Sequence, residues 1–273
     1  MKRIFSKKNM NTKKPLILIV NDDGINSMGI NFIIELVKKR GEIVVVAPQK
    51  EQSAKSNSLT INEDIRIKQV FKSKNLSKYF CTGTPTDCVK IAINKIVKRC
   101  PNLCISGINH GSNSSINVYY SGTVAAALEA SINGIPSLAF SLLDYSLNPN
   151  FYEAKEYILN IIDKILQTNI SDFNYKQKNY IQSKLCLNIN IPNVKKEKIK
   201  GVKVCRQARS KWTENYILTD NKESFKLTGQ LNNLDQNDEN DLSLLEKNFI
   251  TVVPINPDRT FYEMIKQINY LNE

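Results

Sequence analysis

The chain has 273 residues, of which 41% are hydrophobic, and its longest apolar run is far shorter than the roughly 18 residues of a membrane span. These values exclude intrinsic disorder and a transmembrane helix, and they allow one large domain or two small ones. The net charge is 38 − 26 = +12, and residues 1–14 carry six cations and no acid. Because the remaining cations are scattered lysines without interleaved aromatic residues, we attribute the charge to composition and expect no specific nucleic-acid ligand.

The first elements form a β-α-β unit. Residues 16–20 are wholly apolar, as in a strand buried on both faces of a parallel sheet. A helix with apolar residues at helical spacing follows from residue 30 to 37, and we expect Gly41 to end it in the left-handed conformation. A second apolar strand covers 43–47, so a right-handed crossover should place it parallel to the first.

The elements after this unit continue the alternation of helices and strands. In chain order we expect an antiparallel strand over 65–70, a helix over 87–98, a strand over 103–105, a helix over 122–133 with Ser121 as N-cap, a strand over 137–142, a helix over 157–166 and a strand over 185–191. The predicted fold class is therefore α/β, with a Rossmann-like, mostly parallel sheet and flanking helices.

We divide the chain into three parts. Residues 1–14 form a basic disordered tail, residues 15–192 form the Rossmann-like catalytic core, and residues 193–273 form a C-terminal extension. The extension contains an apolar strand over 249–253 and a final helix from residue 260, and its first 67 residues, 193–259, are too polar to make a second core. We expect it to pack on the core and on a partner subunit.

Cysteine and histidine content narrows the chemistry. The six cysteines form no C-x-x-C pair, so a zinc ribbon is not expected and the thiols should be reduced. His110 is the single histidine, which excludes a multi-histidine metal site and requires any histidine-dependent triad to use it. The first apolar run ends in Asn-Asp-Asp rather than in small residues, so we expect no signal peptide and a cytoplasmic location.

Polar residues follow three of the predicted strands, at the edge where α/β sheets bind ligands. Asp22 and Asp23 follow the first strand, Ser53 lies after the second, and Asn109 follows the strand at 103–105. Two adjacent carboxylates after a buried strand repel each other and lose solvation, which a hard cation such as Mg²⁺ or Mn²⁺ would compensate. The alternative is that one aspartate caps the next helix while the other is solvated.

Other polar residues at this edge have both a functional and a structural interpretation. Ser121, Gly122 and Thr123 open a helix, which suits a phosphate group but also describes an ordinary N-cap. Residues 83–87, Gly-Thr-Pro-Thr-Asp, are either a wall of the active site, which we favour, or a turn with a helix cap. His110 is either an acid, a base or a substrate contact or, as we favour, a solvated loop side chain. Trp212 contacts a nucleotide or, as we prefer, packs against protein or a partner subunit.

Five short motifs, in order and at matching spacing over residues 16–142, resemble the SurE family of metal-dependent 5′-nucleotidases. They are Asn-Asp-Asp-Gly at 21–24, Ala-Pro at 47–48 with Gln-Ser at 52–53 and Ser-Asn-Ser-Leu-Thr at 56–60, Gly-Thr-Pro-Thr-Asp-Cys-Val at 83–89, Ser-Gly-Ile-Asn-x-Gly-x-Asn at 106–113, and Tyr-Ser-Gly-Thr-Val at 120–124. Each motif is weak alone, but the five together are specific. The C-terminal half resembles the family more loosely.

The resemblance implies a site and an activity. It implies that one divalent metal cation, Mg²⁺ or Mn²⁺, is bound by Asp22, Asp23, Ser53 and Asn109, with Asp22 and Asp23 also catalytic. It places phosphate on Asn113, Ser121, Gly122 and Thr123. The implied substrates are nucleoside 5′-monophosphates, with 3′-nucleotides and short polyphosphate as further candidates, and the implied assembly is a homodimer or homotetramer that exchanges a C-terminal hairpin and helix.

Three positions depart from the family pattern, which usually has glycine at each. They are Ala54, Ser115, where Ser-Ser replaces Leu-Gly, and Ala130. If the missing glycines have positive φ, Ala54 and Ser115 are strained by about 1 kcal/mol or more.

Two rival functions remain open in the sequence. A haloacid-dehalogenase-like phosphatase also begins with a strand and acidic residues, but it requires Asp-x-Asp, which residues 22–24 lack. A catalytically weak homologue that uses the basic tail to bind nucleic acid or nucleotide would show a steep salt dependence, and it would lose its function on deletion of residues 1–14.

Overall fold

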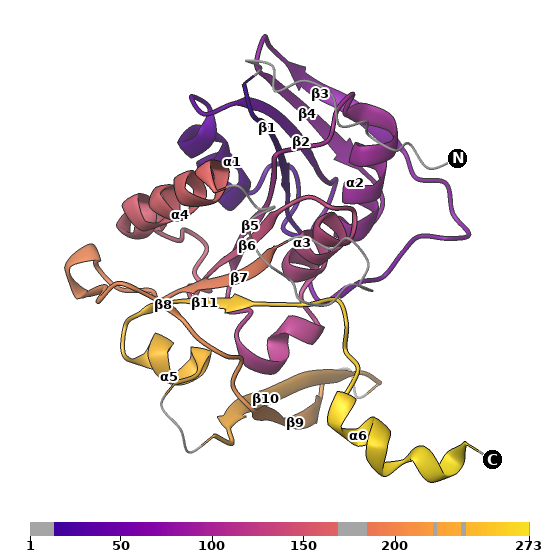
Figure 1. Ribbon diagram of the computed structural model, residues 1–273, viewed down its shortest axis with the longest axis vertical. Helices are drawn as coiled ribbons and strands as arrows, with labels where there is room; N and C mark the ends of the chain where they lie inside the picture. The colour runs from indigo at the N-terminus through magenta and orange to yellow at the C-terminus, as the bar shows by residue number, and fades with distance from the viewer. Residues whose placement is uncertain (1–13, 169–184, 221–222, 236–238, 273) are drawn as a thin grey trace.

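The computed structural model describes residues 14–168, 185–220, 223–235 and 239–272 (Figure 1). The predicted disordered tail therefore lies outside the described residues, apart from Lys14. The first half of the chain contains β1 (Leu16–Val20), α1 (Met28–Val37), β2 (Glu42–Pro48), β3 (Ile67–Lys72), β4 (Leu76–Cys81), α2 (Pro85–Ile91), η1 (Ala92–Ile96), β5 (Leu103–His110), η2 (Ser115–Tyr119), α3 (Gly122–Ile132) and β6 (Ser137–Leu142). The second half contains η3 (Phe151–Ala154), α4 (Lys155–Gln167), β7 (Cys186–Ile191), η5 (Lys196–Lys198), β8 (Val202–Val204), β9 (Ser210–Leu218), β10 (Phe225–Asn233), α5 (Asp241–Glu246), β11 (Ile250–Pro254), α6 (Tyr262–Gln267) and η6 (Asn269–Leu271).

One nine-stranded sheet organises the molecule, in the order β3-β4-β2-β1-β5-β6-β7-β11-β8. The six strands from β4 to β7 pair in parallel, β3 and β11 pair antiparallel to their inner neighbours, and β8 is parallel to β11. The prediction of a mostly parallel, Rossmann-like sheet is confirmed. The strand order reverses between β1 and β5, and a crevice therefore opens beyond their carboxyl ends.

Helices cover both faces of the sheet, with α1 and α4 on one face and α2 and α3 on the other (Figure 1). Successive residues of a strand point to opposite faces, and β1 uses both. Ile17 and Ile19 pack in the cluster that contains α1 and α4, while Leu16, Leu18 and Val20 pack in the cluster that contains α2 and α3. This two-sided burial explains why the strand is apolar at every position.

The predicted strands and helices all form, with corrections at their ends. β4 was not predicted, because its sequence has no alternation and its side chains are mostly half-buried. The helix expected over 87–98 ends as an α-helix at Ile91 and continues as the π-helical η1. The left-handed cap expected at Gly41 is wrong: helix α1 ends at Val37, and Gly41 is needed because a Cβ there would lie 2.3 Å from the carbonyl oxygen of Pro15.

The C-terminal extension contributes to the main sheet and also forms a separate hairpin. Strands β11 and β8 lie beyond residue 192 and complete one edge of the sheet, while β9 and β10 make a two-stranded sheet of their own. The division of the chain at residue 192 stays a prediction. Among the described residues, no helix is long and apolar enough to cross a membrane.

Candidate active site

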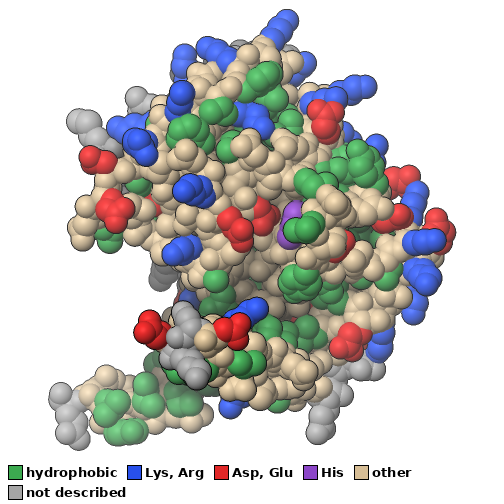
Figure 2. Space-filling view, turned by 180° about the vertical axis from the view of Figure 1, so that it is seen from behind, with side chains coloured by type: hydrophobic (Ala, Val, Ile, Leu, Met, Phe, Trp, Pro, Cys, Tyr) green, Lys and Arg blue, Asp and Glu red, His purple; other side chains and the backbone are tan. Residues whose placement is uncertain are grey.

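A cavity of about 630 Å³ lies beyond the carboxyl ends of β1 and β5, where the strand order reverses. It lies between the core and the β9–β10 hairpin, and Figure 2 shows the hollow on the face that carries the histidine side chain. Five of the predicted site residues line this cavity: Asp22, Ser53, Asn109, Asn113 and Ser121. Segments as far apart in sequence as 22 and 121 therefore meet at one place.

Asp22 is the most buried acid of the site, with 3% of its surface exposed. Its Oδ1 accepts a hydrogen bond from the hydroxyl of Thr123, and its backbone carbonyl accepts one from Gln52 N at 2.7 Å. Burial raises the pKa of Asp22, and the hydrogen bond from Thr123 opposes that rise. Thr123, in the first turn of α3, therefore orients the Asp22 carboxylate through this bond.

Among the predicted site residues, Asp23 has a carboxylate whose charge is poorly balanced by hydrogen bonds. Its Oδ2 is buried and has no hydrogen-bond partner within the described part of the chain. Burial first, then the charge of Asp22 and then that of Glu51, raise the pKa of Asp23 to about 7. A buried carboxylate oxygen without a partner is costly unless a cation or a proton compensates it.

Ser53 and Asn109 complete the predicted ligand set with neutral oxygens. The hydroxyl of Ser53 is exposed and donates to Glu51 at 2.7 Å. The Nδ2 of Asn109 donates to the carbonyls of His110 and Gly111, at 3.2 and 3.0 Å, so its Oδ1 remains for another contact.

The donor set fits a hard divalent cation, because it consists of oxygens and includes an unpartnered carboxylate oxygen. The described residues contain no group of three or more His, Cys, Asp or Glu side chains arranged to hold a metal. The hydroxyl of Ser53 and the amide oxygen of Asn109 are therefore needed to reach the ligand count of such an ion, and a softer ion such as Zn²⁺ is not favoured.

Asn113 is fixed by a buried polar network. Its backbone N–H donates to Asn190 Oδ1 at 2.9 Å, its carbonyl accepts from Asn188 Nδ2 at 2.9 Å, and its own Nδ2 donates to Ser141 Oγ at 2.8 Å. Asn188 and Asn190 are fully buried on β7. These bonds position the loop that carries Asn113. They use one N–H of its Nδ2, so the second N–H and the Oδ1 have no hydrogen-bond partner among the described residues.

The beginning of helix α3 forms the opposite wall. Ser121 is the N-cap of this helix, and its hydroxyl accepts a hydrogen bond from Val124 N at 3.1 Å. Ser121 also lines the cavity. A Cβ on Gly122 would lie 2.9 Å from Asp22 Cβ, so glycine lets the positive end of the helix approach the carboxylate. Thr123 is fully buried, and its hydroxyl is used on Asp22. The structure therefore places Gly122 and Thr123 against Asp22 rather than along the cavity wall.

Two of the three residues that replace a usual family glycine have a left-handed backbone conformation. Ala54 has φ +59° and Ser115 has φ +53°, so the condition stated for their strain is met. Ser115 gains compensation, because its hydroxyl bonds to Ala208 O at 2.8 Å and to Ser210 Oγ at 2.6 Å. Ala130 lies inside helix α3 and needs no unusual backbone conformation.

None of residues 83–87 is among the described residues that line the cavity, so the wall of the active site expected there stays a prediction. Thr84 and Asp87 instead form a capping box at the start of α2, with bonds of 2.9 and 3.2 Å. The carboxylate of Asp87 also accepts from the hydroxyl of Thr60 at 2.7 Å. The motif thus anchors the loop after β2, which is the structural alternative.

Aromatic side chains form the outer part of the cavity. Trp212 on β9 donates from Nε1 to Asn117 Oδ1 at 2.9 Å, and Tyr145 accepts from Ser112 N at 3.1 Å. Both residues line the cavity, together with Tyr120. We expected Trp212 to pack against protein only, but its side chain also lines the cavity.

His110 also lines the cavity, and its ring centroid lies 5.7 Å from that of Phe151. Its Nε2 is buried and without a hydrogen-bond partner among the described residues. Burial lowers the pKa of His110, which favours the neutral imidazole. The side chain is therefore not simply solvated.

Sequence reasoning missed the residues that brace the site from a distance. The carboxylate of Asp241, on α5, accepts from Ser115 N and from Ala208 N, both at 2.8 Å. It is fully buried, and burial raises its pKa against these two bonds. Asn188 and Asn190 had a signal, since two asparagines in an apolar strand are unusual, whereas Asp241 lies 126 residues from Ser115 and had none.

Known proteins resemble this chain over most of its length. The family model described as Survival protein SurE matches residues 17–214. The 5′-nucleotidase SurE of Christiangramia forsetii is 45% identical over 268 residues, which is 95% of this chain and 98% of that protein. The 5′-nucleotidase SurE of Flavobacterium psychrophilum is 43% identical, over 94% and 97%. The crystal structure of the SurE protein from Aquifex aeolicus superposes with a TM-score of 0.76 at 32% identity, and the match covers 95% of this chain and all of that one.

Proposed function

This chain belongs to the SurE family, and we propose that it acts as a 5′-nucleotidase, a phosphoric monoester hydrolase that releases phosphate from nucleoside 5′-monophosphates. One observation carries the proposal. Asp22 lies against the positive end of helix α3 in a cavity with aromatic walls, and the adjacent Asp23 has a buried oxygen without a partner among the described residues. Short polyphosphate and 3′-nucleotides are further candidate substrates of the same site.

The cofactor of the proposal is one divalent cation, Mg²⁺ or Mn²⁺, held by Asp22, Asp23, Ser53 and Asn109. The unpartnered Oδ2 of Asp23 and the available Oδ1 of Asn109 support this ligand set. When bound, such a cation polarises phosphoryl oxygens and lowers the pKa of water at the site.

The chain's own residues supply position and charge for in-line attack by water. The carboxylates of Asp22 and Asp23 orient the water, and Thr123 keeps Asp22 in place. The second Nδ2 N–H of Asn113 and the hydroxyl of Ser121 donate to the phosphoryl oxygens and, with the positive end of α3, stabilise their developing charge. The cavity then presents the nucleoside to Trp212, Tyr120 and Tyr145, whose rings suit a planar base.

We further propose a homodimer or homotetramer that forms through residues 193–273. Exposed apolar side chains on this segment support the assembly. They include Tyr216, Ile217, Leu218, Phe225 and Leu227 on the β9–β10 hairpin, and Phe261, Ile265, Ile268 and Leu271 near the C-terminus. Light scattering of the full chain is expected to give at least twice the monomer mass. A monomer at all concentrations would contradict the assembly.

Phosphate release tests the activity. The full chain is incubated with 5′- and 3′-nucleoside monophosphates in excess chelator, and Mg²⁺ or Mn²⁺ is then restored. We expect release only with metal, and Asp23→Ala should reduce it at least about 10³-fold if that carboxylate holds the cation. Asp64→Ala, at an exposed acid of the loop after β2, is the matched control and should leave the rate unchanged.

The same experiment separates the rival function. Binding of single-stranded RNA without hydrolysis of any nucleotide, by folded protein with either metal, would replace the enzyme with a basic binding protein.

A further inference from the structure

A second cavity of about 630 Å³ lies at the opposite end of the sheet from the active site. It is lined by the first residues of three parallel strands, Leu16 of β1, Glu42 of β2 and Leu76 of β4, whereas the active site lies beyond the last residues of β1 and β2. Five residues of β1 at about 3.3 Å each separate the two edges by roughly 16 Å. A molecule in this cavity therefore does not occupy the active site.

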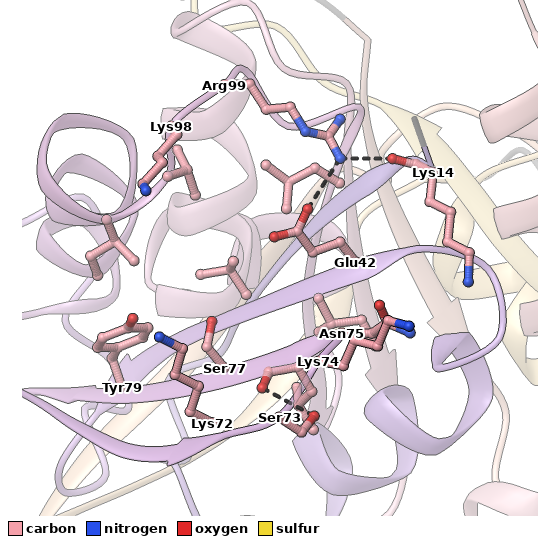
Figure 3. A pocket seen from close by; sticks show the side chains of 16 residues that line it. Lys14, Glu42, Lys72, Ser73, Lys74, Asn75, Ser77, Tyr79, Lys98 and Arg99 are labelled. Carbon is pink, nitrogen blue, oxygen red and sulfur yellow. Dashed lines mark hydrogen bonds and ion pairs between the residues drawn. The ribbon is translucent and has the colours of Figure 1, made fainter. Parts of the chain in front are cut away.

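Positive charge dominates the lining. Lys14, Lys72, Lys74, Lys98 and Arg99 line the cavity, and Glu42 is the single acid among its described lining residues. That acid is engaged, because its Oε2 lies 3.3 Å from Arg99 Nη2, which also donates to the carbonyl of Lys14 at 2.7 Å. Figure 3 shows this ion pair, with the lysine side chains around the cavity.

The four lysines have no acidic partner among the described residues. The ion pairs in the described part of the chain use other lysines and arginines. Arg99 is the only cation of this cavity among them. Lys72 and Lys98 approach from different elements, since Lys72 ends β3 while Lys98 follows η1. Four lysines that line one cavity, where the single carboxylate is paired with Arg99, favour a ligand with several negative charges.

The cavity also offers surface for a planar, partly apolar group. Tyr79 and Ser77 lie on one face of β4, and Ser77 is opposite Lys72 in the strand register. Figure 3 shows Lys72, Ser77 and Tyr79 together on one side of the cavity. Leu16, Val44 and Val97, all buried, form its base. An aromatic ring beside lysines is suited to a nucleobase that carries phosphates.

We propose that this cavity is a second ligand site that binds a nucleoside di- or triphosphate, with the phosphates on Lys14, Lys72, Lys74 and Lys98 and the base against Tyr79. A terminal phosphate carries about −1.5 to −2 charges at neutral pH, so one phosphate leaves about half of the lysine charge uncompensated. A chain of two or three phosphates carries enough negative charge to balance the four lysines. The site is distinct from the hydrolytic centre and does not depend on the proposed metal.

The test measures binding at the second site alone. A fluorescent, non-hydrolysable nucleoside triphosphate analogue is titrated into the full chain in excess chelator, with Asp23→Asn to disable the active site. We expect saturable binding that K72Q/K98Q weakens about tenfold or more, because two charge contacts are lost. The matched control K155Q/K195Q, at exposed lysines near α4, should change the dissociation constant less than about twofold. In the otherwise wild-type chain, K72Q/K98Q should leave phosphate release unchanged, which shows that the double variant is folded.

Competitors identify the ligand class. Unlabelled nucleoside triphosphate should displace the probe, and inorganic triphosphate should do so more weakly. Tyr79→Leu should weaken the nucleoside probe but not inorganic triphosphate. The proposal is overturned if the probe does not bind, if both lysine double variants weaken it equally, or if Tyr79→Leu has no effect on the nucleoside probe. Displacement by short single-stranded RNA at lower concentration than by nucleoside triphosphate would also overturn it, in favour of a nucleic-acid surface.

Discussion

The two cavities at opposite edges of the sheet have the same volume, about 630 Å³, and opposite charge. The cavity at the carboxyl edge contains short side chains that are buried and hydrogen-bonded, such as Asp22 and Asn113. The cavity at the amino edge contains long lysine side chains that reach in from its rim. Catalysis depends on fixed positions, whereas attraction of a polyanion depends mainly on summed charge.

This contrast has a structural origin in what lies beneath each cavity. Under the active site, the partners of the site residues are themselves buried, as Thr123, Asn188 and Asn190 are. Around the basic cavity, the lysine ammonium groups are free to move on four-carbon stems. Substitutions that disturb buried partners should therefore impair hydrolysis strongly, and equal disturbance at the basic cavity should not.

Among the residues that support the site from behind, the largest effect is expected at Thr123. Thr123→Val removes the hydroxyl that donates to Asp22, and loss of such a supporting bond typically reduces metal affinity or activity about 10–100-fold. Thr123→Ser keeps the donor and should retain most of the activity. Steady-state kinetics at several metal concentrations measures both variants. Equal activity of the Thr123→Val and Thr123→Ser enzymes would show that the bond does not position Asp22.

The next effect concerns the buried asparagines of β7. Asn190→Leu leaves the N–H of Asn113 without its acceptor, which should reduce the free energy of unfolding by about 1–3 kcal/mol. It should also lower kcat/KM, because the loop that carries Asn113 loses its anchor. Urea unfolding and kinetics of Asn190→Leu are compared with Asn148→Leu, at an exposed position. Unchanged kcat/KM in a folded Asn190→Leu enzyme would show that Asn190 does not position Asn113 for catalysis.

A smaller effect is expected in the pH dependence of stability. Burial and the charges of Asp22 and Glu51 raise the pKa of Asp23 from 3.8 to about 7 in the metal-free protein. The folded state then binds more protons than the unfolded state between about pH 4 and 7, so this group's contribution to stability falls as pH rises through that range. Cation binding replaces the proton, so the rise in Tm on adding Mg²⁺ or Mn²⁺ should be larger at pH 8 than at pH 5.5. Calorimetry that gives the same rise at both pH values would contradict the ligand role of Asp23.

The smallest effects separate the two strained positions. Ala54→Gly relieves a left-handed alanine and should raise the free energy of unfolding by about 0.5–1 kcal/mol. Ser115→Gly relieves similar strain but loses hydroxyl bonds to Ala208 and Ser210, each worth about 0.5–1.5 kcal/mol, so it should be neutral or destabilising. Denaturant unfolding of both variants checks the difference in sign. A gain at Ser115 equal to that at Ala54 would show that these bonds contribute nothing.

The fold was predictable where local sequence carries its own signal. Apolar runs such as 16–20 and the helical spacing around Ile30 and Ile33 are decided by burial on one or both faces, which the residue pattern records. β4 escaped because its half-buried side chains do not alternate. Strands β8 and β11 gave no indication that they join the core sheet, since strand pairing across 48 residues or more is set by tertiary packing.

The candidate site was predictable in its membership but less so in its internal roles. Asp22, Ser53, Asn109, Asn113 and Ser121 meet in one cavity, and their ligand roles stay predictions. For residues 83–87 the structure shows the helix cap and leaves the wall of the active site a prediction, because the same Thr-Pro-Thr-Asp pattern suits either role. Which interpretation applies depends on the neighbours that the fold supplies.

The sequence by itself determined the parallel α/β core, the acidic and amide residues at its carboxyl edge, and the family. Local patterning and motif order are enough for these, because strand burial, helix caps and polar strand ends are short-range properties. Only the tertiary structure decided that Thr123 holds Asp22, that Asp241 braces Ser115, and that four lysines from three segments of the chain share one cavity. These contacts join residues that are distant in sequence, and such contacts exist only once the whole sheet has assembled.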